Sequence, residues 1–236
     1  MNADFSRAPI LYIDESLLVI NKPAGLPTLP DGYNPEAPYV RRLLEPEFGR
    51  LWIVHRLDRD TSGVLLLART AEAHRLLNSQ FNQRQVSKIY HAIVHGSPDW
   101  DTKTVDLRLR VDVGHKHRTA VDPRRGKPAV TGLRVLQRFP GYTLIKAVPA
   151  TGRTHQIRAH LAAVGHPLLA DDLYGNLPAP EADPIIARLA LHALLLNIEH
   201  PVSYAPLHFK APYPEDFERA LASLRRMRGP LVWSAG

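Results

Sequence analysis

The sequence predicts an α+β fold, and two observations lead to that class. Short segments rich in Val, Ile and Leu, several of them alternating with polar residues, recur between Gly and Pro residues, which is typical of strands. Only a few segments carry the apolar repeat of an amphipathic helix. Many short strands with few helices favour a sheet whose neighbouring strands are mostly antiparallel.

Six segments have the composition of strands, with turn-forming residues on either side. We expect them over residues 11–21, 63–68, 88–95, 131–138, 142–148 and 192–198. Two further segments, 26–38 and 176–184, are rich in Pro, Gly and acidic residues, and apolar strands resume after each. We therefore interpret both as exposed loops inside a single domain that covers residues 1–236.

Three segments predict helices. The first, 70–84, has Thr70 as a candidate N-cap. The second begins near Thr154 and stops at Gly165, because glycine readily adopts the left-handed conformation that ends helices. The third, 214–227, has acidic residues in its first turn and arginines in its last, which suits the helix dipole. The expected buried faces consist of His74, Leu77 and Phe81, then Ile157, Leu161 and Val164, then Phe217, Leu221 and Leu224.

The charge of the chain favours a polyanionic partner. Its formal net charge is +7 at pH 7, and an excess of this kind attracts nucleic acid through counterion release. Part of the excess lies in residues 108–127, which hold seven Lys or Arg and two Asp. With Gly114, Gly126 and Pro128 as turn residues, we expect a basic hairpin or loop here. A solvated basic loop without a ligand is the alternative.

Several classes of protein are excluded by composition. The absence of cysteine rules out disulfides and thiol catalysis. No run approaches the roughly 18 apolar residues of a membrane span, and residues 1–5 do not begin a secretory signal, so we expect a cytoplasmic protein with no membrane association. His155 and His160 are five residues apart, which is a poor match to one helix face, and RNA contact explains His115 and His117 in the basic segment as well as a metal would. We expect no metal.

The most informative motif is His-Arg-Leu-Asp-Arg-Asp-Thr-Ser-Gly at residues 55–63, directly before an apolar strand. Turn chemistry alone could explain an Asp before Thr-Ser-Gly. As a whole, however, the motif resembles the HRLDxxTSG signature of RluA-type RNA pseudouridine synthases. Residues 12–25 are similar to the opening strand pair and KPxG turn of that family. Further similar segments lie at residues 88–96, 126–131, 151–161, 165–168 and 191–193.

The resemblance implies a fold and a reaction. The fold would be a long mixed sheet, mostly antiparallel, with flanking helices and a central cleft. The reaction would convert a uridine in structured ribosomal or transfer RNA to pseudouridine, without any cofactor. The essential aspartate of the family falls on Asp58, its base-stacking tyrosine on Tyr90 and the arginine beside the aspartate on Arg158, with Arg153 as the fallback. A core tyrosine is the alternative for Tyr90, and an exposed helical arginine for Arg158.

The resemblance also suggests residues that bind the substrate. Arg56 matches the residue that fills the space left by the extruded uridine, although a phosphate contact or a surface charge is an alternative. Leu191 matches an apolar residue that packs on uracil, and a core leucine is nearly as good an explanation. We expect the remaining RNA contacts at Arg153, Lys116, Arg118 and Lys127. The accessory S4 domain of many relatives is expected to be absent here, and the chain is expected to be a monomer.

Two other functions compete with this one. A non-catalytic RNA-binding or RNA-chaperone protein on the same fold would keep the basic hairpin but would not need Asp58. A hydrolase acting on a small nucleoside could use Asp58 and His55 as an acid–base pair, and it would release free base. Two departures from the family pattern, residues 29–31 and Gly132 where a bulkier residue is common, bear on substrate choice more than on chemistry.

Overall fold

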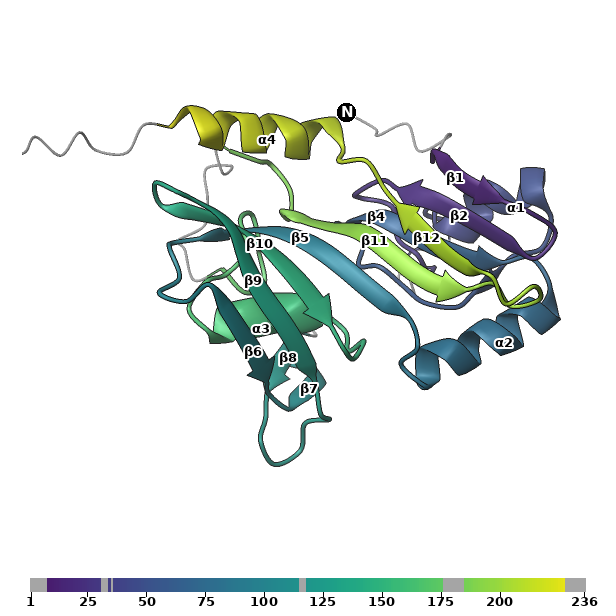
Figure 1. Ribbon diagram of the computed structural model, residues 1–236, viewed down its shortest axis with the longest axis horizontal. Helices are drawn as coiled ribbons and strands as arrows, with labels where there is room; N and C mark the ends of the chain where they lie inside the picture. The colour runs from purple at the N-terminus through teal and green to yellow at the C-terminus, as the bar shows by residue number, and fades with distance from the viewer. Residues whose placement is uncertain (1–7, 31–33, 35, 115–117, 176–184, 228–236) are drawn as a thin grey trace, which may run out of the picture.

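One large sheet runs through the molecule (Figure 1). The computed structural model describes residues 8–30, 34, 36–114, 118–175 and 185–227. The strands of the sheet are β1 (Ile10–Ile13), β2 (Leu17–Lys22), β3 (Trp52–Ile53), β4 (Ser62–Ala68), β5 (Ser87–His95), β6 (Thr102–Asp106), β9 (Val130–Phe139), β10 (Tyr142–Pro149), β11 (Leu191–Glu199) and β12 (Pro206–Lys210). Their order is β1-β2-β4-β11-β5-β10-β9-β6, with β3 beside β4 and β12 beside β11. Among the described strands only β4 and β11 pair in parallel, which confirms the predicted mixed, mostly antiparallel sheet.

The N-terminal segment is a β-hairpin, whereas the apolar pattern predicted a single strand over residues 11–21. β1 and β2 pair antiparallel, with Ile13 opposite Leu18. The reversal is fixed by Asp14, whose Oδ1 accepts the backbone N–H groups of Ser16 and Leu17, both at 2.7 Å. Such local bonding by aspartate favours a turn. The hairpin agrees with the strand pair implied by the family resemblance.

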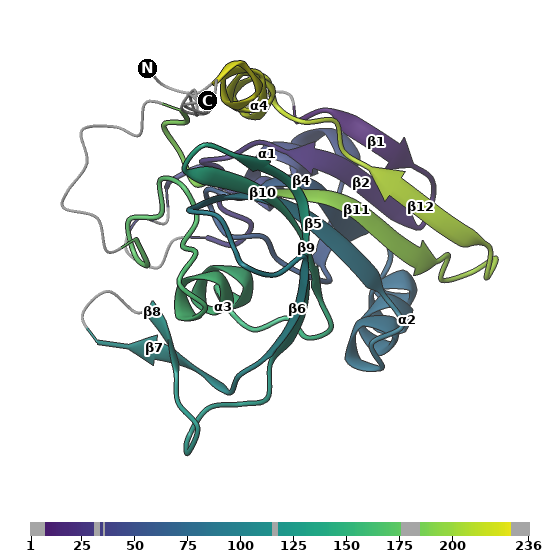
Figure 2. The ribbon, with the colours of Figure 1, turned by 60° about the vertical axis from the view of Figure 1, so that its left-hand side comes forward.

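Helices cover both faces of the sheet at each end. α1 (Val40–Phe48) and α2 (Ala71–Asn82) pack on opposite faces of β2 and β4, and α3 (Gln156–Ala163) and α4 (Glu215–Arg226) on opposite faces of β5 and β10. Figure 2 shows α3 beneath the twisted strands and α4 across their far end. Because the sheet is covered on both sides, β4 is buried along its whole length. None of the described helices has the length and apolar composition needed to cross a membrane.

Three of the helices were predicted, and their ends follow the expected chemistry. The Thr70 side chain caps α2 by accepting the N–H of Ala73 at 3.1 Å. Gly165, with φ +85°, follows α3 and ends it. The buried faces of α3 and α4 match the prediction. In α2 only Leu77 of the predicted face is fully buried, because the helix is rotated so that His74 and Phe81 lie at the margin of the contact.

Four described elements were not predicted: α1, β3, β6 and β12. α1 contains Pro46 and has no side-chain cap, so its sequence does not read as a helix. β12 begins with a proline, which cannot donate to a neighbouring strand, and β6 is short and mostly exposed. Each is stabilised by its partners in the sheet or the core, which a local pattern does not reveal.

The predicted basic hairpin is present as β7 (Leu109–Val113) and β8 (Arg118–Val121), a separate two-stranded sheet. It lies beside α3, away from the large sheet (Figure 2). Two hydrogen bonds from Thr119 in β8 hold the hairpin. Thr119 donates its N–H to the Tyr174 hydroxyl at 2.7 Å and its own hydroxyl to the Thr154 carbonyl at 2.8 Å. The hairpin is thus tied to the turn that begins α3.

The two ends of the sheet meet at a very short junction, which consists of Ser62 and Gly63 in β4 and His192 and Ala193 in β11. Only these two parallel pairs appear in the register. The Ser62 hydroxyl and His192 Nδ1 are hydrogen-bonded at 2.9 Å. Gly63 has φ +117°, and a Cβ placed on it would lie 2.2 Å from the Ala193 carbonyl oxygen. Glycine is therefore required where the two backbones cross.

This contact generates a stability prediction. Gly63→Ala should lower the free energy of unfolding by about 3 kcal/mol or more, because the added methyl group must push β11 away from β4. Urea denaturation followed by circular dichroism measures the change. Gly141→Ala is the matched control, since Gly141 also has a positive φ, +77°, but open space around it, and should cost only about 1 to 2 kcal/mol. Equal losses in the two variants would contradict the steric explanation.

Candidate active site

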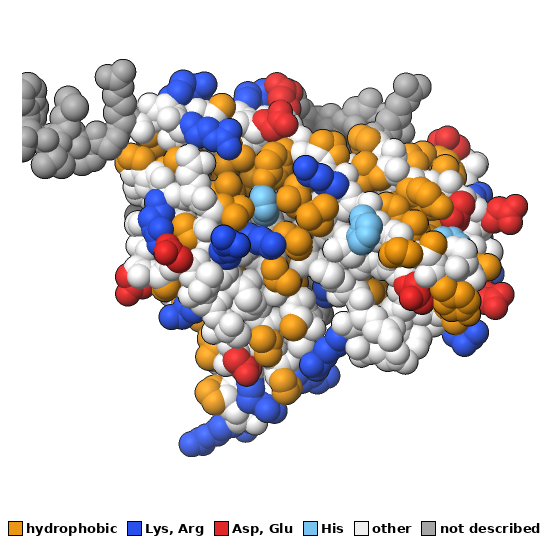
Figure 3. Space-filling model, in the orientation of Figure 1, with side chains coloured by type: hydrophobic (Ala, Val, Ile, Leu, Met, Phe, Trp, Pro, Cys, Tyr) orange, Lys and Arg blue, Asp and Glu red, His pale blue; other side chains and the backbone are white. Residues whose placement is uncertain are grey.

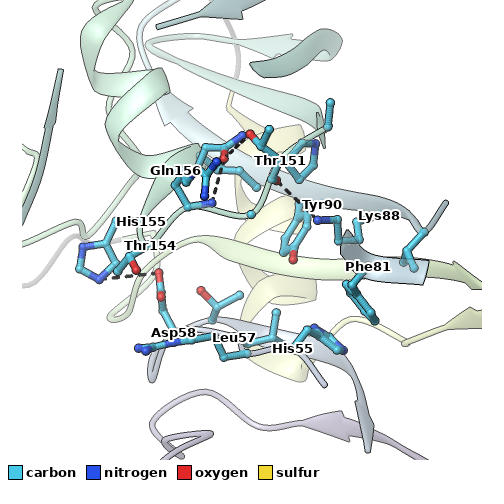
Figure 4. A pocket seen from close by; sticks show the side chains of 18 of the residues that line it. His55, Leu57, Asp58, Phe81, Lys88, Tyr90, Thr151, Thr154, His155 and Gln156 are labelled. Atoms are coloured by element: carbon cyan, nitrogen blue, oxygen red, sulfur yellow. Dashed lines mark hydrogen bonds and ion pairs between the residues drawn. The ribbon is translucent and has the colours of Figure 1, made fainter. Parts of the chain in front are cut away.

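A cleft of about 450 Å³ opens between the segment before β4, the middle of β5 and the turn that joins β10 to α3. Figure 4 shows that side chains from these segments point into one space. The cleft brings together six of the nine predicted site residues, which come from four separate parts of the chain: Arg56, Asp58, Tyr90, Arg153, Arg158 and Leu191.

The backbone around Asp58 is fixed by the N-terminal turn. The Thr28 hydroxyl donates to the Leu57 carbonyl at 2.8 Å and accepts the Leu57 N–H at 3.2 Å. On the other side, the buried Lys22 ammonium donates to the Arg59 carbonyl at 3.0 Å. Because both neighbours of Asp58 are held, its side chain, 19% exposed, projects into the cleft (Figure 4).

Arg158 lies between two carboxylates. Its Nε and Nη2 donate to Asp171 at 2.8 and 2.6 Å, while Nη1 lies 3.9 Å from Asp58 Oδ2. The ring of Tyr174 lies 5.2 Å from the guanidinium. Burial opposes the charge of Arg158, but the hydrogen bonds and charge of Asp171, with a further contribution from Asp58, raise its pKa above the usual value. Arg158 is thus a fixed cation that Asp171 orients towards Asp58.

Tyr90 faces the cleft from the middle of β5, opposite Ala193 and Ala147 in the neighbouring strands. In Figure 4 its ring and hydroxyl point towards the loop that carries Leu57 and Asp58. Burial, and then the charge of Asp58, raise the pKa of the Tyr90 hydroxyl well above its usual value of 10. The phenol is therefore neutral at physiological pH, so it offers a flat apolar ring with one hydroxyl to a ligand.

His155 belongs to the site, although the sequence suggested it only as a metal ligand. Its Nε2 lies 3.9 Å from Asp58 Oδ2, and its Nδ1 is 3.2 Å from the Tyr174 hydroxyl. Burial lowers the pKa of His155, and the nearby Asp58 acts in the opposite direction. The residue has φ +51°, an uncommon left-handed conformation directly before α3. That conformation turns the ring towards Asp58. No local sequence pattern predicts the left-handed conformation of His155.

The partners of Arg158 were also missed. Asp171 is buried and follows α3 in a turn, where its Oδ1 accepts the N–H groups of Leu173 and Tyr174, both at 3.1 Å. Aspartate often bonds the backbone N–H groups two and three residues later, so the sequence around Asp171 predicts only a turn. Its pairing with Arg158 depends on the return of the chain after α3. The only available signal was a carboxylate within about twenty residues of a buried arginine.

The remaining predicted site residues lie outside the cleft lining. Arg118 is exposed on β8, and Lys127 is exposed where its backbone pairs with Leu109. Lys116 lies outside the described residues. The structure thus places two of the predicted RNA contacts on or beside the basic hairpin, while Arg56 is exposed at the mouth of the cleft.

Of the two histidine pairs, only His155 and His160 lie among the described residues. His160 Nδ1 is hydrogen-bonded to the Thr131 hydroxyl at 2.9 Å, on the core side of α3, and so does not share a site with His155. His115 and His117 lie outside the described residues. In the described part of the chain, no group of three or more His, Asp or Glu residues has an arrangement that could hold a metal ion.

Comparison with known proteins identifies the family. Residues 16–163 match the profile of RNA pseudouridylate synthase. Ribosomal large subunit pseudouridine synthase C of Vibrio vulnificus is 41% identical over 93% of this chain and 70% of the relative. Synthase D of Neisseria meningitidis serogroup B is 39% identical over 93% of this chain, which spans only 62% of that relative.

A solved structure gives the same result. Human RNA Pseudouridylate Synthase Domain Containing 1 has a TM-score of 0.76 and 25% identity, with 98% of this chain and 99% of the human chain covered. The pseudouridine synthase fold implied by the resemblance is thereby confirmed. The sequence matches and the shared fold agree over most of the described residues, and the chain belongs to the RluA-type RNA pseudouridine synthase family.

Proposed function

We propose that this chain is an RNA pseudouridine synthase that isomerises a uridine in structured RNA without a cofactor. The observation that carries the proposal is the Asp58 carboxylate, which shares a cleft with Tyr90 and lies 3.9 Å from Arg158. The names of the relatives favour large-subunit ribosomal RNA over transfer RNA as substrate. We further propose that residues 1–236 form one catalytic domain and that the protein is a cytoplasmic monomer.

The proposed reaction exchanges one bond for another within the same nucleotide. The C1′–N1 bond of uridine breaks and a C1′–C5 bond forms, while the proton on C5 is lost and N1 gains one. Asp58 is the catalytic residue that acts on the ribose or the base. Arg158 supports it, because a cation close to a half-buried carboxylate offsets the cost of keeping that carboxylate ionised.

The other cleft residues hold the base. A uridine must leave its stack to reach Asp58, which costs a few kcal/mol. Aromatic stacking on Tyr90 and packing on Leu191 offset part of this cost, and both side chains line the cleft. Arg56, exposed at the mouth of the cleft, fills the space that the extruded base leaves in the RNA.

The hydrolase alternative is disfavoured by the position of His55. Its Nε2 accepts the N–H of Leu66 at 3.0 Å, and its ring stacks on Phe81. Burial, together with the charge of Lys88, lowers the pKa of His55 to about 3, so the imidazole is neutral. The ring bonds β4 and does not pair with Asp58. A non-catalytic RNA-binding protein remains the second candidate, and substitution of Asp58 separates the two.

The central prediction concerns Asp58. Asp58→Asn should lower pseudouridine formation by at least about a thousandfold, because the isosteric amide cannot replace the carboxylate. RNA affinity should stay within a few-fold of wild type. The assay is pseudouridine mapping of total RNA from cells with and without the gene, followed by rescue with each form. Retained isomerisation by the variant would refute the assignment, and normal RNA binding with no product from wild type would favour the non-catalytic protein.

A second prediction treats Asp171 as a positioning residue. In Asp171→Asn, Arg158 loses its charged partner and can turn to pair directly with Asp58. We expect kcat to fall about 10 to 100-fold with KM within twofold of wild type, since the cation is displaced without loss of substrate contacts. Single-turnover kinetics and thermal unfolding are measured on the same preparation. A folded variant with wild-type kcat would leave Asp171 with a structural role only.

A third prediction follows from the half-buried His55. The unfolded chain binds a proton at His55 below about pH 6.5, whereas the folded protein does not until about pH 3, so stability falls as the pH decreases through this window. His55→Gln should weaken that fall by at most about 1.4 kcal/mol per pH unit. Urea denaturation between pH 6.5 and 5 measures it. The exposed His208→Gln control should keep the wild-type profile, and identical slopes in all three proteins would contradict the prediction.

A further inference from the structure

A second groove, here called the outer groove, lies on the face of the sheet opposite the cleft. On β10, Ala147 shares a face with Tyr90 of β5, and the preceding Lys146 therefore points to the other face. The outer groove has a volume of about 330 Å³. The side chains that face it include two cations and two hydroxyl groups beside a glycine, from β6, β9 and β10: Thr102, Thr104, Gly132, Arg134 and Lys146.

The cations of the outer groove repel one another in the free protein. Arg134 is directly opposite Lys146 in the β9–β10 pair, and like charges in that position destabilise a sheet. The acid nearest to them along β6, Asp101, pairs with Arg138 at 2.8 Å instead. Neither Arg134 nor Lys146 takes part in an ion pair with another described residue. An anion bound between them would remove this cost.

Further positive charge continues across the same face. Lys146 is opposite His91 of β5, and the charges of Lys146 and Lys210 add to burial in lowering the pKa of His91 to about 4. Figure 3 shows Lys and Arg side chains on this face, around a histidine and apolar surface. The groove is thus part of a broader positive surface that α4 leaves open.

Gly132 keeps the outer groove open. It lies between Thr104 and Val148 in the register, at the floor of the groove. A Cβ at this position would meet only the Val148 carbonyl oxygen, at 3.8 Å, which is an ordinary contact. The backbone therefore does not require glycine here. The absence of a side chain at Gly132 therefore leaves the floor of the groove open without being needed by the fold.

We propose that the outer groove binds the sugar-phosphate backbone of the RNA substrate at a point away from the target uridine. This inference rests on the proposed function. The end of β10 connects the two sites, since Val148 lines the groove and the next residues, Pro149 to Thr151, line the cleft. RNA that leaves the cleft around this edge reaches the groove directly.

The lining favours RNA over an acidic protein. Lys, Arg and Thr side chains are the usual contacts to phosphate oxygens, and such contacts position a nucleic acid without reading its sequence. A protein partner would instead need an apolar centre from which water is excluded. The outer groove offers only Leu133, which is 3% exposed, and the edge residue Val148.

The test compares three variants of the full chain. Arg134→Ala/Lys146→Ala removes two groove cations, and Gly132→Val fills the floor without changing charge. Arg219→Ala/Arg226→Ala removes two exposed cations from α4 and is the charge-matched control. The probe is an unmodified transcript of large-subunit ribosomal RNA, with Kd measured from 50 to 200 mM KCl. Poly-L-glutamate is titrated in parallel as a model of an acidic protein.

The double groove variant should bind the transcript about tenfold more weakly, and the slope of log Kd against log salt should fall by about two, one for each lost phosphate contact. Gly132→Val should also weaken binding, and the α4 control should change Kd less than twofold. At saturating RNA, kcat should be unchanged in the α4 control.

Three results would overturn the inference. Groove variants with wild-type Kd would show that RNA does not contact this face. An equal loss in the α4 control would show that only net charge matters. A loss of poly-L-glutamate binding with RNA affinity intact would assign the groove to an acidic protein. The measurement of Kd does not depend on catalysis. A wild-type chain that binds RNA but makes no pseudouridine would refute the proposed function, and the Kd values of the groove variants would still test the groove.

Discussion

The rest of the structure depends on the two parallel residue pairs that join β4 to β11. They are the only pairing between the N-terminal strands and the larger antiparallel part of the described sheet. Asp58 lies four residues before this junction, Leu191 one residue before it, and Tyr90 is opposite Ala193 on the far side of β11. The cleft therefore forms where the two parts of the sheet meet. Gly63, which permits the close approach of the backbones, sets the separation of the site residues.

The electrostatics of the cleft depend on Arg158, whose positive charge is shared between Asp171 and Asp58. Its short, paired hydrogen bonds go to Asp171, which is fully buried, while Asp58 interacts at 3.9 Å and remains 19% exposed. A direct bidentate bond between Arg158 and Asp58 would occupy both oxygens of the Asp58 carboxylate. By satisfying the guanidinium elsewhere, Asp171 lets Arg158 act through its charge and leaves the oxygens of Asp58 open to a ligand.

The sequence predicted those features that depend on neighbouring residues. The Thr70 cap, the glycine that ends α3 and the strand segments of the sheet are local, and all were found, except that residues 11–21 form a hairpin and not one strand. Asp58, Tyr90 and Arg158 were predicted to share one site because of the motif resemblance, and not because of any periodicity. The features that were not predicted depend on contacts between residues far apart in the chain. α1 contains Pro46 and is held by core packing, and Asp171 reads as a turn residue until the chain folds it against Arg158.

The two faces of the sheet carry different kinds of polar groups. Most groups in the cleft are buried or half-buried, whereas Arg118, Lys127 and Arg134 are exposed and Lys146 is half-buried. In the proposed function the cleft would specify the target nucleotide, and these cations would position the RNA backbone. Unpaired like charges such as Arg134 and Lys146 cost stability in the free protein. A polyanion bound between them would relieve this repulsion, so the charges that weaken the empty sheet would strengthen such a complex. The net charge of +7 is therefore better explained by a large polyanion than by a small nucleoside that fills only the cleft.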